Sequence, residues 1–448
     1  MGKVKVKNEK VRMIASIPVI NFHVAGIDVH DSEMFVAYPV NSESIQVKTF
    51  GTFTSDLKLI VETLKDAKVT SVAMESTGVY WVTLFLLLQE EGFEVYLVNS
   101  QQTKNVAGRK EDDHDALWIH QLHSCGLLKA SFQPDKMTRA LREMVRHRKN
   151  LVETTTDYIN RMQKALELMN IKLHTVISDI DGKSGRKIIE AILAGERDPE
   201  VLADLRDVRI KASREVIIKS LEGYWLNEHL FSLKQCYQLY STHRELINEC
   251  DKEIEKQLIE QIASTNGGEI PEIPQISRKV STKNKIPYNL TSILNEILGV
   301  DITRVTGLSE LSVLTIMSEV GTDMSKWKTQ HHFTSWINVV PNTKMSGGKI
   351  ISSRVKKKKN NVGQVFRIAA NSLYKSQTPL GDYYRRIKAS SGASKAVVAT
   401  ARKLAIIYYI MVSRKQEYNP IALEEYQRKY KEMKINNLKK KLAQLEAA

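Results

Sequence analysis

Four acidic residues crowd into one short stretch of a chain that is otherwise basic. The stretch GRKEDDHDALWIHQLHSCGLL spans residues 108–128, and its clustered acids are Glu111, Asp112, Asp113 and Asp115. Asp112 and Asp115 are three residues apart, so on a helix they would share a face. Neighbouring carboxylates repel each other unless a cation lies between them, and the hard ions Mg²⁺ and Mn²⁺ prefer such oxygen ligands. The spacing therefore makes this stretch a candidate metal-binding segment.

Two further acids occupy positions typical of a site on a β-sheet. Asp28 lies inside the apolar run VAGIDV, residues 24–29, where an unpaired carboxylate would be costly to bury. Glu75 ends the run VTSVAME, residues 69–75, and sites are built where such strands end. If these two acids converged with Asp112 and Asp115, the four carboxylates could hold two divalent ions about 4 Å apart, the arrangement that serves phosphoryl transfer.

Each acid also has a purely structural explanation. Glu111 and Asp113 suit the first turn of a helix, where the helix dipole favours negative charge. Asp112 or Asp115 alone could likewise be a first-turn residue or an N-cap. Asp28 would be a turn residue if its strand ended early, and Glu75 would be a salt-bridge partner. The combination of four acids in this order, rather than any single one, favours the metal site.

Histidine and cysteine spacing indicates no zinc site. His114, His120 and His123 lack the i, i+4 pair of a zincin helix and are interpreted as surface or structural residues. The three cysteines of the chain are too few and too far apart for a disulfide framework. This cysteine usage favours a reducing compartment, and the cytosol is the expected one.

A serine beside two glycines is the second candidate centre. Ser346 precedes a Gly-Gly pair, which allows a close backbone approach to a ligand, and Lys349 follows. A hydroxyl can attack a phosphodiester when the developing charge is neutralised. Ser-Gly-Gly is also an ordinary turn sequence, and Ser352 and Ser353 lie close by. The residue pattern alone therefore leaves the nucleophile open.

The charge of the chain points to a nucleic-acid partner. Its 448 residues include 66 Lys plus Arg against 51 Asp plus Glu, a formal net charge of +15. Residues 344–416 alone contain seventeen Lys or Arg and one acid, Asp382, whereas a merely solvated surface would mix both signs. Such a block is typical of a phosphate-binding surface. The cations expected to bind nucleic acid are Arg109, Lys110, Lys344, Lys349, Arg354, Lys356, Lys357, Lys358, Lys359 and Arg367.

Short alternating runs predict the elements that would position these groups. Five runs are β-rich: residues 24–29, 33–40, 44–50, 69–75 and 93–98. Helical patterns lie among and after them at residues 54–67, 79–91 and 114–124. The first of these helices would bury Leu57, Ile60, Val61 and Leu64. Three strands followed by alternating helix and strand is the element order of the ribonuclease H-like fold, a mixed α/β sheet covered by helices.

The rest of the chain is predicted to be mainly helical. Heptad-like spacing through residues 230–262 favours a coiled coil, formed within one chain or between two. Its apolar positions are Leu233, Tyr237, Tyr240, Ile247, Ile254 and Leu258. Residues 264–291 contain three prolines and polar breakers and are predicted to be a linker. Residues 302–321 resemble a helix-hairpin-helix without its usual second glycine, for which an ordinary helical hairpin is the more cautious interpretation.

Taken together, the motifs resemble one known family. The series GIDVH, AMESTGVYW and VYLVNSQQTKNVAGRKEDDHDALWIHQLHSCGLLKASFQP is similar to the N-terminal domain of the DEDD-type insertion-sequence transposases. These enzymes are related to the Piv-type DNA invertases and to the RuvC Holliday-junction resolvase. The similarity continues through LREMVRHRKNLVETTTDYINRMQKALELMNIKL, GTDMSKW and SGGK, so it covers nearly the whole chain. The resemblance implies that the catalytic acids are Asp28, Glu75, Asp112 and Asp115 and that the catalytic serine is Ser346.

Two motifs depart from the family pattern. Glu111 stands where the family more often has Ser or Thr, and an extra acid, Asp113, follows. This departure leaves open which of Asp112, Asp113 and Asp115 bind metal. The Lys-Gly-Asn that the family has after the basic run is replaced by KKNN, so the local geometry of that loop is also open.

The resemblance implies an RNA-guided DNA transposase or recombinase. Its RuvC-like acids would bind Mg²⁺ or Mn²⁺, and a serine from a different subunit would form a covalent phosphoserine intermediate. A structured noncoding RNA, the bridge RNA, would select the double-stranded donor and target DNA. The protein would be a homo-oligomer, a dimer or a tetramer, in the bacterial or archaeal cytosol near the nucleoid and without membrane association.

Six segments are expected along the chain. They are a basic N-terminal arm (1–20), a RuvC-like catalytic domain (21–135), a helical coiled-coil region (136–263), the linker (264–291), a C-terminal transposase domain with the catalytic serine (292–420) and a basic amphipathic tail helix (421–448).

Two other functions fit the same residues. A metal-dependent, RuvC-like junction-resolving endonuclease would use water instead of Ser346. A non-catalytic nucleic-acid-binding protein would bind with steep salt dependence and cut nothing. The complete set of acids argues against the binding protein, and the SGGK motif argues against the water-using nuclease.

Overall fold

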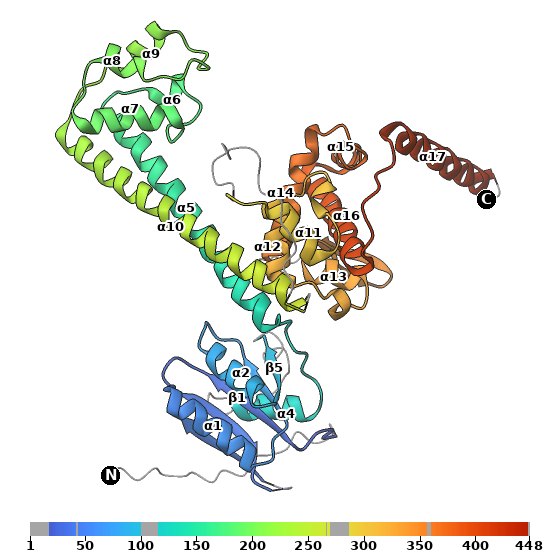
Figure 1. The fold of residues 1–448 in the computed structure, drawn as a ribbon. Helices are drawn as coiled ribbons and strands as arrows, with labels where there is room; N and C mark the ends of the chain where they lie inside the picture. Colours follow the sequence, from blue (N-terminus) through green and yellow to red (C-terminus); the bar gives the residue numbers. More distant parts are fainter. Residues whose placement is uncertain are drawn as a thin grey trace. The chain divides into compact units, whose positions relative to one another are not determined.

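Two compact units make up the chain. The computed structural model describes residues 18–41, 44–99, 115–265, 267–268, 286–355 and 360–446. The units are Met1–Gln133 and Pro134–Ala448. Figure 1 shows a sheet with helices in the first unit and an almost entirely helical second unit.

A mixed five-stranded sheet forms the first unit. Its strands are β1 (Val24–Val29), β2 (Met34–Pro39), β3 (Ile45–Phe50), β4 (Ser71–Glu75) and β5 (Glu94–Val98). The order across the sheet is β3-β2-β1-β4-β5, with β1, β2 and β3 antiparallel and β1, β4 and β5 parallel. The helices are α1 (Thr54–Asp66), α2 (Trp81–Glu90) and α4 (Asp115–Ser124). The predicted mixed α/β sheet with helices is confirmed, and each predicted strand and helix is found within a few residues of its expected bounds.

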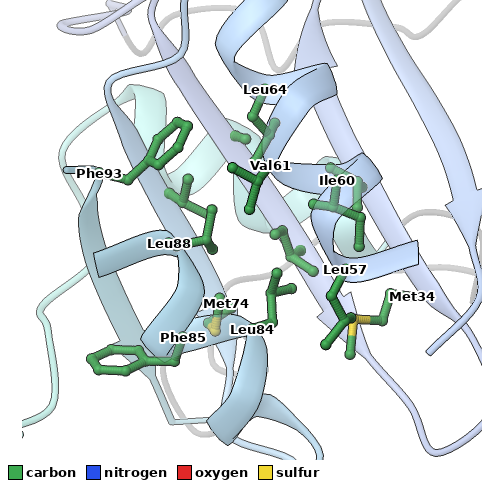
Figure 2. Packing of buried hydrophobic residues seen from close by; sticks show 14 of the residues in the cluster. Met34, Leu57, Ile60, Val61, Leu64, Met74, Leu84, Phe85, Leu88 and Phe93 are labelled. Atoms are coloured by element: carbon green, nitrogen blue, oxygen red, sulfur yellow. The ribbon is translucent and has the colours of Figure 1, made fainter. Parts of the chain in front are cut away.

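One face of the sheet carries the main core of the first unit. The apolar stripe of α1 packs on it, and the predicted Leu57, Ile60, Val61 and Leu64 are all buried there. Figure 2 shows them interlocked with Leu84, Phe85 and Leu88 of α2. This packing follows from the helical spacing of the apolar residues, since positions three and four apart share a face.

The other face of the sheet is covered by α4 at very short range. A Cβ added to Gly26 in β1 would lie 2.2 Å from the backbone nitrogen of His120 and 2.4 Å from the carbonyl oxygen of Ala116. Only glycine leaves room for the helix backbone at this point. Ile119 and Leu122 of α4 then pack with residues of β4 and β5.

Two long helices lead the second unit. These are α5 (Lys136–Leu168) and α10 (Asn227–Thr265), which pack along each other (Figure 1). The buried pair Arg148 and Asp251 joins them, with Nη2 to Oδ2 at 3.2 Å. Of the predicted heptad residues, Leu233, Tyr240, Ile247, Ile254 and Leu258 are buried and Tyr237 is half-buried. Regular coiled-coil packing stays a prediction.

A small helical cluster connects α5 to α10. Its helices are α6 (Leu173–Val176), α7 (Lys183–Ala194), α8 (Pro199–Asp204) and α9 (Arg214–Leu221). Their apolar side chains share one core with the end of α5 and the start of α10. The connection is thus a folded part of the unit, and it lies within residues 136–263, which were predicted to be helical.

The C-terminal part of the second unit is a helical bundle with one hairpin. Its α-helices are α11 (Leu290–Leu298), α12 (Glu310–Val320), α13 (Gln330–Trp336), α14 (Asn361–Ser372), α15 (Pro379–Ser391), α16 (Ala393–Arg414) and α17 (Leu423–Glu446). Three short 3-10 turns accompany them at Ile302–Arg304, Met324–Lys326 and Leu373–Lys375. The hairpin consists of β6 (Asn342–Ser346) and β7 (Lys349–Arg354). The segment compared with a helix-hairpin-helix therefore pairs a 3-10 turn with α12, and that motif stays a prediction.

The helix α16 is long and apolar enough, by length and composition, to cross a membrane. Half of the apolar stretch of this helix is nevertheless buried inside the unit. Tyr408 of α16 is fully buried, with Phe333 stacked at 6.3 Å and Phe366 edge-on at 6.0 Å between ring centroids. These contacts identify α16 as the central core helix of the bundle.

A buried carboxylate connects α5 to the helices of the bundle. Glu319 of α12 accepts hydrogen bonds from Arg146 of α5, with Nε to Oε1 at 2.8 Å and Nη2 to Oε2 at 2.9 Å. Asn361, at the start of α14, donates to Oε1 of the same carboxylate at 2.9 Å. Burial alone would raise the pKa of Glu319, but the bonds from Arg146 and Asn361 and the charge of Arg142 lower it below its ordinary value.

Replacing Gly26 by alanine should destabilise the first unit by about 3 kcal/mol, because the added methyl group meets helix backbone that cannot move aside. Thermal unfolding followed by circular dichroism measures the loss. In Gly51→Ala the added methyl group meets only the flexible Asp56 carboxylate, so this control should lose about 1 kcal/mol. Equal losses in the two variants would contradict the tight contact between α4 and β1.

Replacing Glu319 by glutamine should lower the free energy of unfolding at pH 7 by about 2 kcal/mol, the worth of hydrogen bonds to a charged group. Because the folded-state pKa of Glu319 is lowered, its contribution is present above the ordinary value of 4.5 and is lost as the pH falls below it. Urea unfolding at pH 7 and at about pH 3.5 should therefore show the two proteins converging in acid. Glu153→Gln, at an exposed position further along α5, is the control, and a pH-independent difference for Glu319→Gln would refute the assignment.

Candidate active site

Two neighbouring strands bring Asp28 and Glu75 to one edge of the sheet. β1 and β4 are parallel, and Ile27 pairs with Met74. Asp28 and Glu75 are the next residues along the two strands, so they lie beside each other across the sheet. The carboxyl edge of parallel strands is where open α/β sheets bind ligands.

Both acids lie on the face that α4 covers. Side chains alternate between the two faces along a strand, and Gly26, two residues before Asp28, faces the backbone of α4. On β4, the Ser71 hydroxyl contacts His123 of α4, and Glu75 is four residues further along the same strand. The alternation therefore assigns Asp28 and Glu75 to the same face.

The direction of α4 brings Asp115 toward the same edge. The C-terminal end of the helix is held at the start of β4, where His123 Nε2 lies 2.8 Å from Ser71 Oγ. Its first turn packs with Phe35 of β2, which is the strand partner of Asp28. Asp115 is the first residue of α4, so three of the four predicted acids approach one edge from three elements.

Asp28 is buried, with only 7% of its surface exposed, and its charge has a protein partner. His30 Nε2 lies 3.0 Å from Asp28 Oδ2, and the His30 ring packs edge-on against Phe35. This hydrogen bond offsets part of the cost of burying a carboxylate. His30 was not among the predicted site residues, although its position two residues after Asp28 in GIDVH was the available signal.

The donor atoms at this edge suit a hard divalent ion. Asp28, Glu75 and Asp115 offer only carboxylate oxygens, which Mg²⁺ and Mn²⁺ prefer. Within the described ranges, no three His, Cys, Asp or Glu side chains stand close enough together to hold a metal ion. Asp112 lies outside the described residues. The acids thus share an edge and a face, while a complete ligand set is not present among the described side chains.

The two described histidines of α4 are structural residues. Burial, together with the neighbouring charge of His123, lowers the pKa of His120 to about 4. Burial also lowers the pKa of His123, against the opposing effect of Glu94. Both rings are therefore neutral at pH 7, and both are buried. The structural interpretation of these two residues agrees with their burial, whereas His114 lies outside the described residues.

Ser346 lies at the open tip of the β6–β7 hairpin. It pairs with Lys349 across a two-residue turn, Gly347 and Gly348, whose φ angles are 54° and 76°. Left-handed backbone at both central positions is the geometry of a type I′ turn, which explains the two glycines. A Cβ added at either glycine would meet no atom within 4 Å, so the space around the tip is open.

The rival serines lie further from the tip. Ser352 pairs with Lys344 and is half-buried, and Ser353 pairs with Thr343. Of the three candidates, Ser346 is the one beside the open turn. That position offers the easiest approach for a bulky phosphodiester.

The hairpin has two chemically different faces. Because side chains alternate along a strand, Lys344 and Ser346 share a face, and Lys349 joins them as the partner of Ser346. Met345 and Ile350 pair on the opposite face. One face therefore combines a hydroxyl with two cations, and the other is apolar.

The basic block is only partly free surface. Lys344, Lys349 and Arg354 are exposed on the hairpin. Arg367, by contrast, donates to the carbonyl oxygen of Asn338, and burial lowers the pKa of its guanidinium. Four cations of the block and two beside the acidic stretch lie outside the described residues: Lys356, Lys357, Lys358, Lys359, Arg109 and Lys110.

The last helix covers further cations of the block. The guanidinium carbon of Arg386 lies 3.5 Å from the ring centroid of Tyr430 in α17, and Nε of Arg386 lies 3.1 Å from Asp382. Lys403 lies over the rings of Tyr383 and Tyr426, and burial lowers its pKa. A cation held over aromatic rings is stabilised within the protein. The number of Lys and Arg residues in 344–416 therefore overestimates how many of them are available to bind phosphates.

Two models of known protein families match the chain. The DEDD transposase model of the IS110 family matches residues 25–171. The model described as transposase, IS116/IS110/IS902 family, matches residues 301–385. No curated protein matches the chain.

The two matches contain both candidate centres. The first includes Asp28, Glu75 and Asp115, and the second includes the Ser346 hairpin. Together they cover just over half of the chain and occur in the order that the sequence resemblance implied. The chain therefore contains two domains of the IS110-family insertion-sequence transposases, and its enzymatic role is that of a DNA transposase or recombinase.

Proposed function

We propose that the protein cuts and rejoins DNA through a serine–phosphodiester intermediate at a site that also needs the acids of the sheet edge. The observation that carries this proposal is the shared edge and face of Asp28 and Glu75, with Asp115 beginning the helix that covers them. An oxygen-only site of this kind suits phosphoryl transfer. The open hairpin supplies an accessible hydroxyl for the same chemistry.

In the proposed reaction, Ser346 Oγ attacks the phosphorus atom of a DNA phosphodiester. A bond forms between Oγ and phosphorus, and the bond from phosphorus to one deoxyribose oxygen breaks. Ser346 gives up its hydroxyl proton as the new bond forms, and the departing oxygen takes up a proton and becomes a free hydroxyl end, so the protons balance. A hydroxyl end of another strand then attacks the phosphoserine, which restores the diester and frees the serine. The number of phosphodiester bonds is conserved, so no energy source is required.

Charge at the reacting phosphate would be neutralised from two sides. Lys344 and Lys349 share the face of Ser346 and are exposed, so they can approach the phosphate oxygens. A divalent ion bound by Asp28, Glu75, Asp112 and Asp115 would supply Lewis-acid stabilisation when present. We propose that the acids and the serine come from different subunits of a homo-oligomer.

Guidance by a structured noncoding RNA is the further part of the proposal. It rests on the family resemblance and on the exposed cations Lys344, Lys349 and Arg354 of the hairpin, which suit the backbones of RNA and DNA. The RNA would pair with donor and target DNA, so base pairing would supply the sequence preference. The expected location is the cytosol, near the nucleoid.

Asp28→Asn should retain the fold and lower DNA strand cleavage about 10²-fold or more, because an amide cannot provide the charge that a bound cation requires. A cleavage assay across a Mg²⁺ and Mn²⁺ titration measures this, and Asp31→Asn, at an exposed position three residues away, is the control. The rise in unfolding temperature caused by Mn²⁺ should also shrink in Asp28→Asn only. Unchanged cleavage with unchanged metal dependence would remove the acids from the mechanism.

Ser346→Ala should abolish a covalent protein–DNA adduct, because Ser346 is the one of the three described hairpin serines that lies beside the open turn. The protein is incubated with Mg²⁺, the RNA that flanks its element and labelled junction DNA, and then separated under denaturing conditions. Ser352→Ala is the matched control and should keep the adduct. Cleavage without an adduct in the unchanged protein would instead establish the water-using nuclease.

A further inference from the structure

Among the described residues, none covers the apolar side chains of the β6–β7 hairpin. Met345, Ile350 and Ile351 are 62%, 64% and 68% exposed. Met345 and Ile350 form a cross-strand pair, and a register shift between Lys344 and Met345 inserts Ile351 as an extra residue. Such bulges re-aim side chains. Single exposed apolar residues are normal on protein surfaces, but three adjoining ones on one ribbon form a patch.

A hairpin of this kind needs a partner to be rigid. Two strands without a third strand or a packed helix are only marginally stable in water. Every described residue of β6 is exposed, and Ser352 is the only half-buried residue of β7. The two strands are thus open to contact with another molecule.

The charge of the hairpin indicates the chemistry of that molecule. Lys344 and Lys349 lie on the serine face, Arg354 ends the second strand, and no acid occurs from Lys344 up to Asp382. Cations on a narrow ribbon suit a phosphate backbone. Apolar side chains that enter DNA displace base stacking, which is how many DNA-bending proteins use Met, Leu and Ile.

We propose that the β6–β7 hairpin is a strand-separating pin that enters the DNA duplex at the site of cleavage. The serine face follows the backbone of the strand to be cut, and the apolar face packs against the unpaired or unstacked bases. The idea rests on the proposed function, since it places the pin at the phosphate that Ser346 attacks.

The pin would link strand opening to cleavage. Ser346 and Met345 are adjacent, so the phosphate that reaches the hydroxyl belongs to the step that the apolar residues open. Pyrimidine–purine steps are the easiest to unstack and would be favoured at that position. An opened duplex is also what pairing with a guide RNA requires.

The test measures unstacking directly in the full-length Ser346→Ala protein, which binds without cutting. Duplexes that span the element end each contain one 2-aminopurine, placed at successive positions, and are tested with and without the RNA that flanks the element. The parent protein should raise 2-aminopurine fluorescence at one or two neighbouring positions. The combined variant Met345→Thr, Ile350→Thr and Ile351→Thr should lose this rise, while its DNA affinity stays within about three-fold because the phosphate contacts remain.

Threonine keeps the strand preference of the replaced residues, so the hairpin itself should persist. Ile368→Thr, on α14 and 62% exposed, is the matched control and should keep the fluorescence rise. Three results would overturn the proposal: a rise that persists in the triple variant, no rise in the bound parent, or a triple variant that changes only the oligomeric state in sedimentation. The last result would make the patch a contact between copies of the chain.

Failure of this proposal can be told apart from failure of the proposed function. The protein with intact Ser346 is tested for the covalent protein–DNA adduct, which measures the serine reaction independently of base unstacking. An adduct without unstacking would reject the pin alone. A protein that binds none of the duplexes would contradict DNA processing itself, and the pin with it.

Discussion

The close contact between α4 and β1 is the constraint on which the N-terminal candidate site depends. Gly26 lets the helix backbone lie almost on the strand, and the bond between His123 and Ser71 fixes which end of the helix faces which edge of the sheet. Asp115 reaches the carboxyl edge through these two contacts, since it begins the helix that they hold. A larger residue at position 26 would push the helix away, and the three acids would no longer share a face and an edge.

The candidate nucleophile of the second unit, unlike the acids of the first, is exposed. The acids lie in or beside a packed sheet, whereas Ser346 lies on a thin ribbon with open space around its turn. A buried carboxylate holds its charge in a defined position, and an exposed hydroxyl can follow a bulky substrate. The two arrangements suit different roles. Groups that stabilise charge in a reaction must be held in fixed positions, whereas a nucleophile must reach a phosphate within a long DNA strand.

Much of the fold could be predicted from the sequence, because the buried face of a helix or strand requires apolar residues at regular spacing. The spacing of Leu57, Ile60, Val61 and Leu64 predicted the buried face of α1, and the strand runs predicted the sheet that places Asp28 beside Glu75. Side chains that are far apart in the sequence but bonded in the fold show no such regular spacing. Arg146 and Glu319 are 173 residues apart, and nothing local distinguishes Arg367, which bonds inside the protein, from the exposed Arg354. The contribution of Asp112 stays a prediction, because it lies outside the described residues.

The carboxylate of Glu319 is shared by two parts of the second unit, and this has a mechanical consequence. Both of its oxygens accept hydrogen bonds from Arg146 on the long helix α5, and Oε1 also accepts one from Asn361 in the first turn of α14, the helix that follows the serine hairpin in the chain. The side chain therefore couples the long helix α5 to the start of α14. A movement of α5 would have to break the hydrogen bonds from Arg146 or draw Glu319 away from Asn361, so the positions of α5 and of the first turn of α14 are not independent.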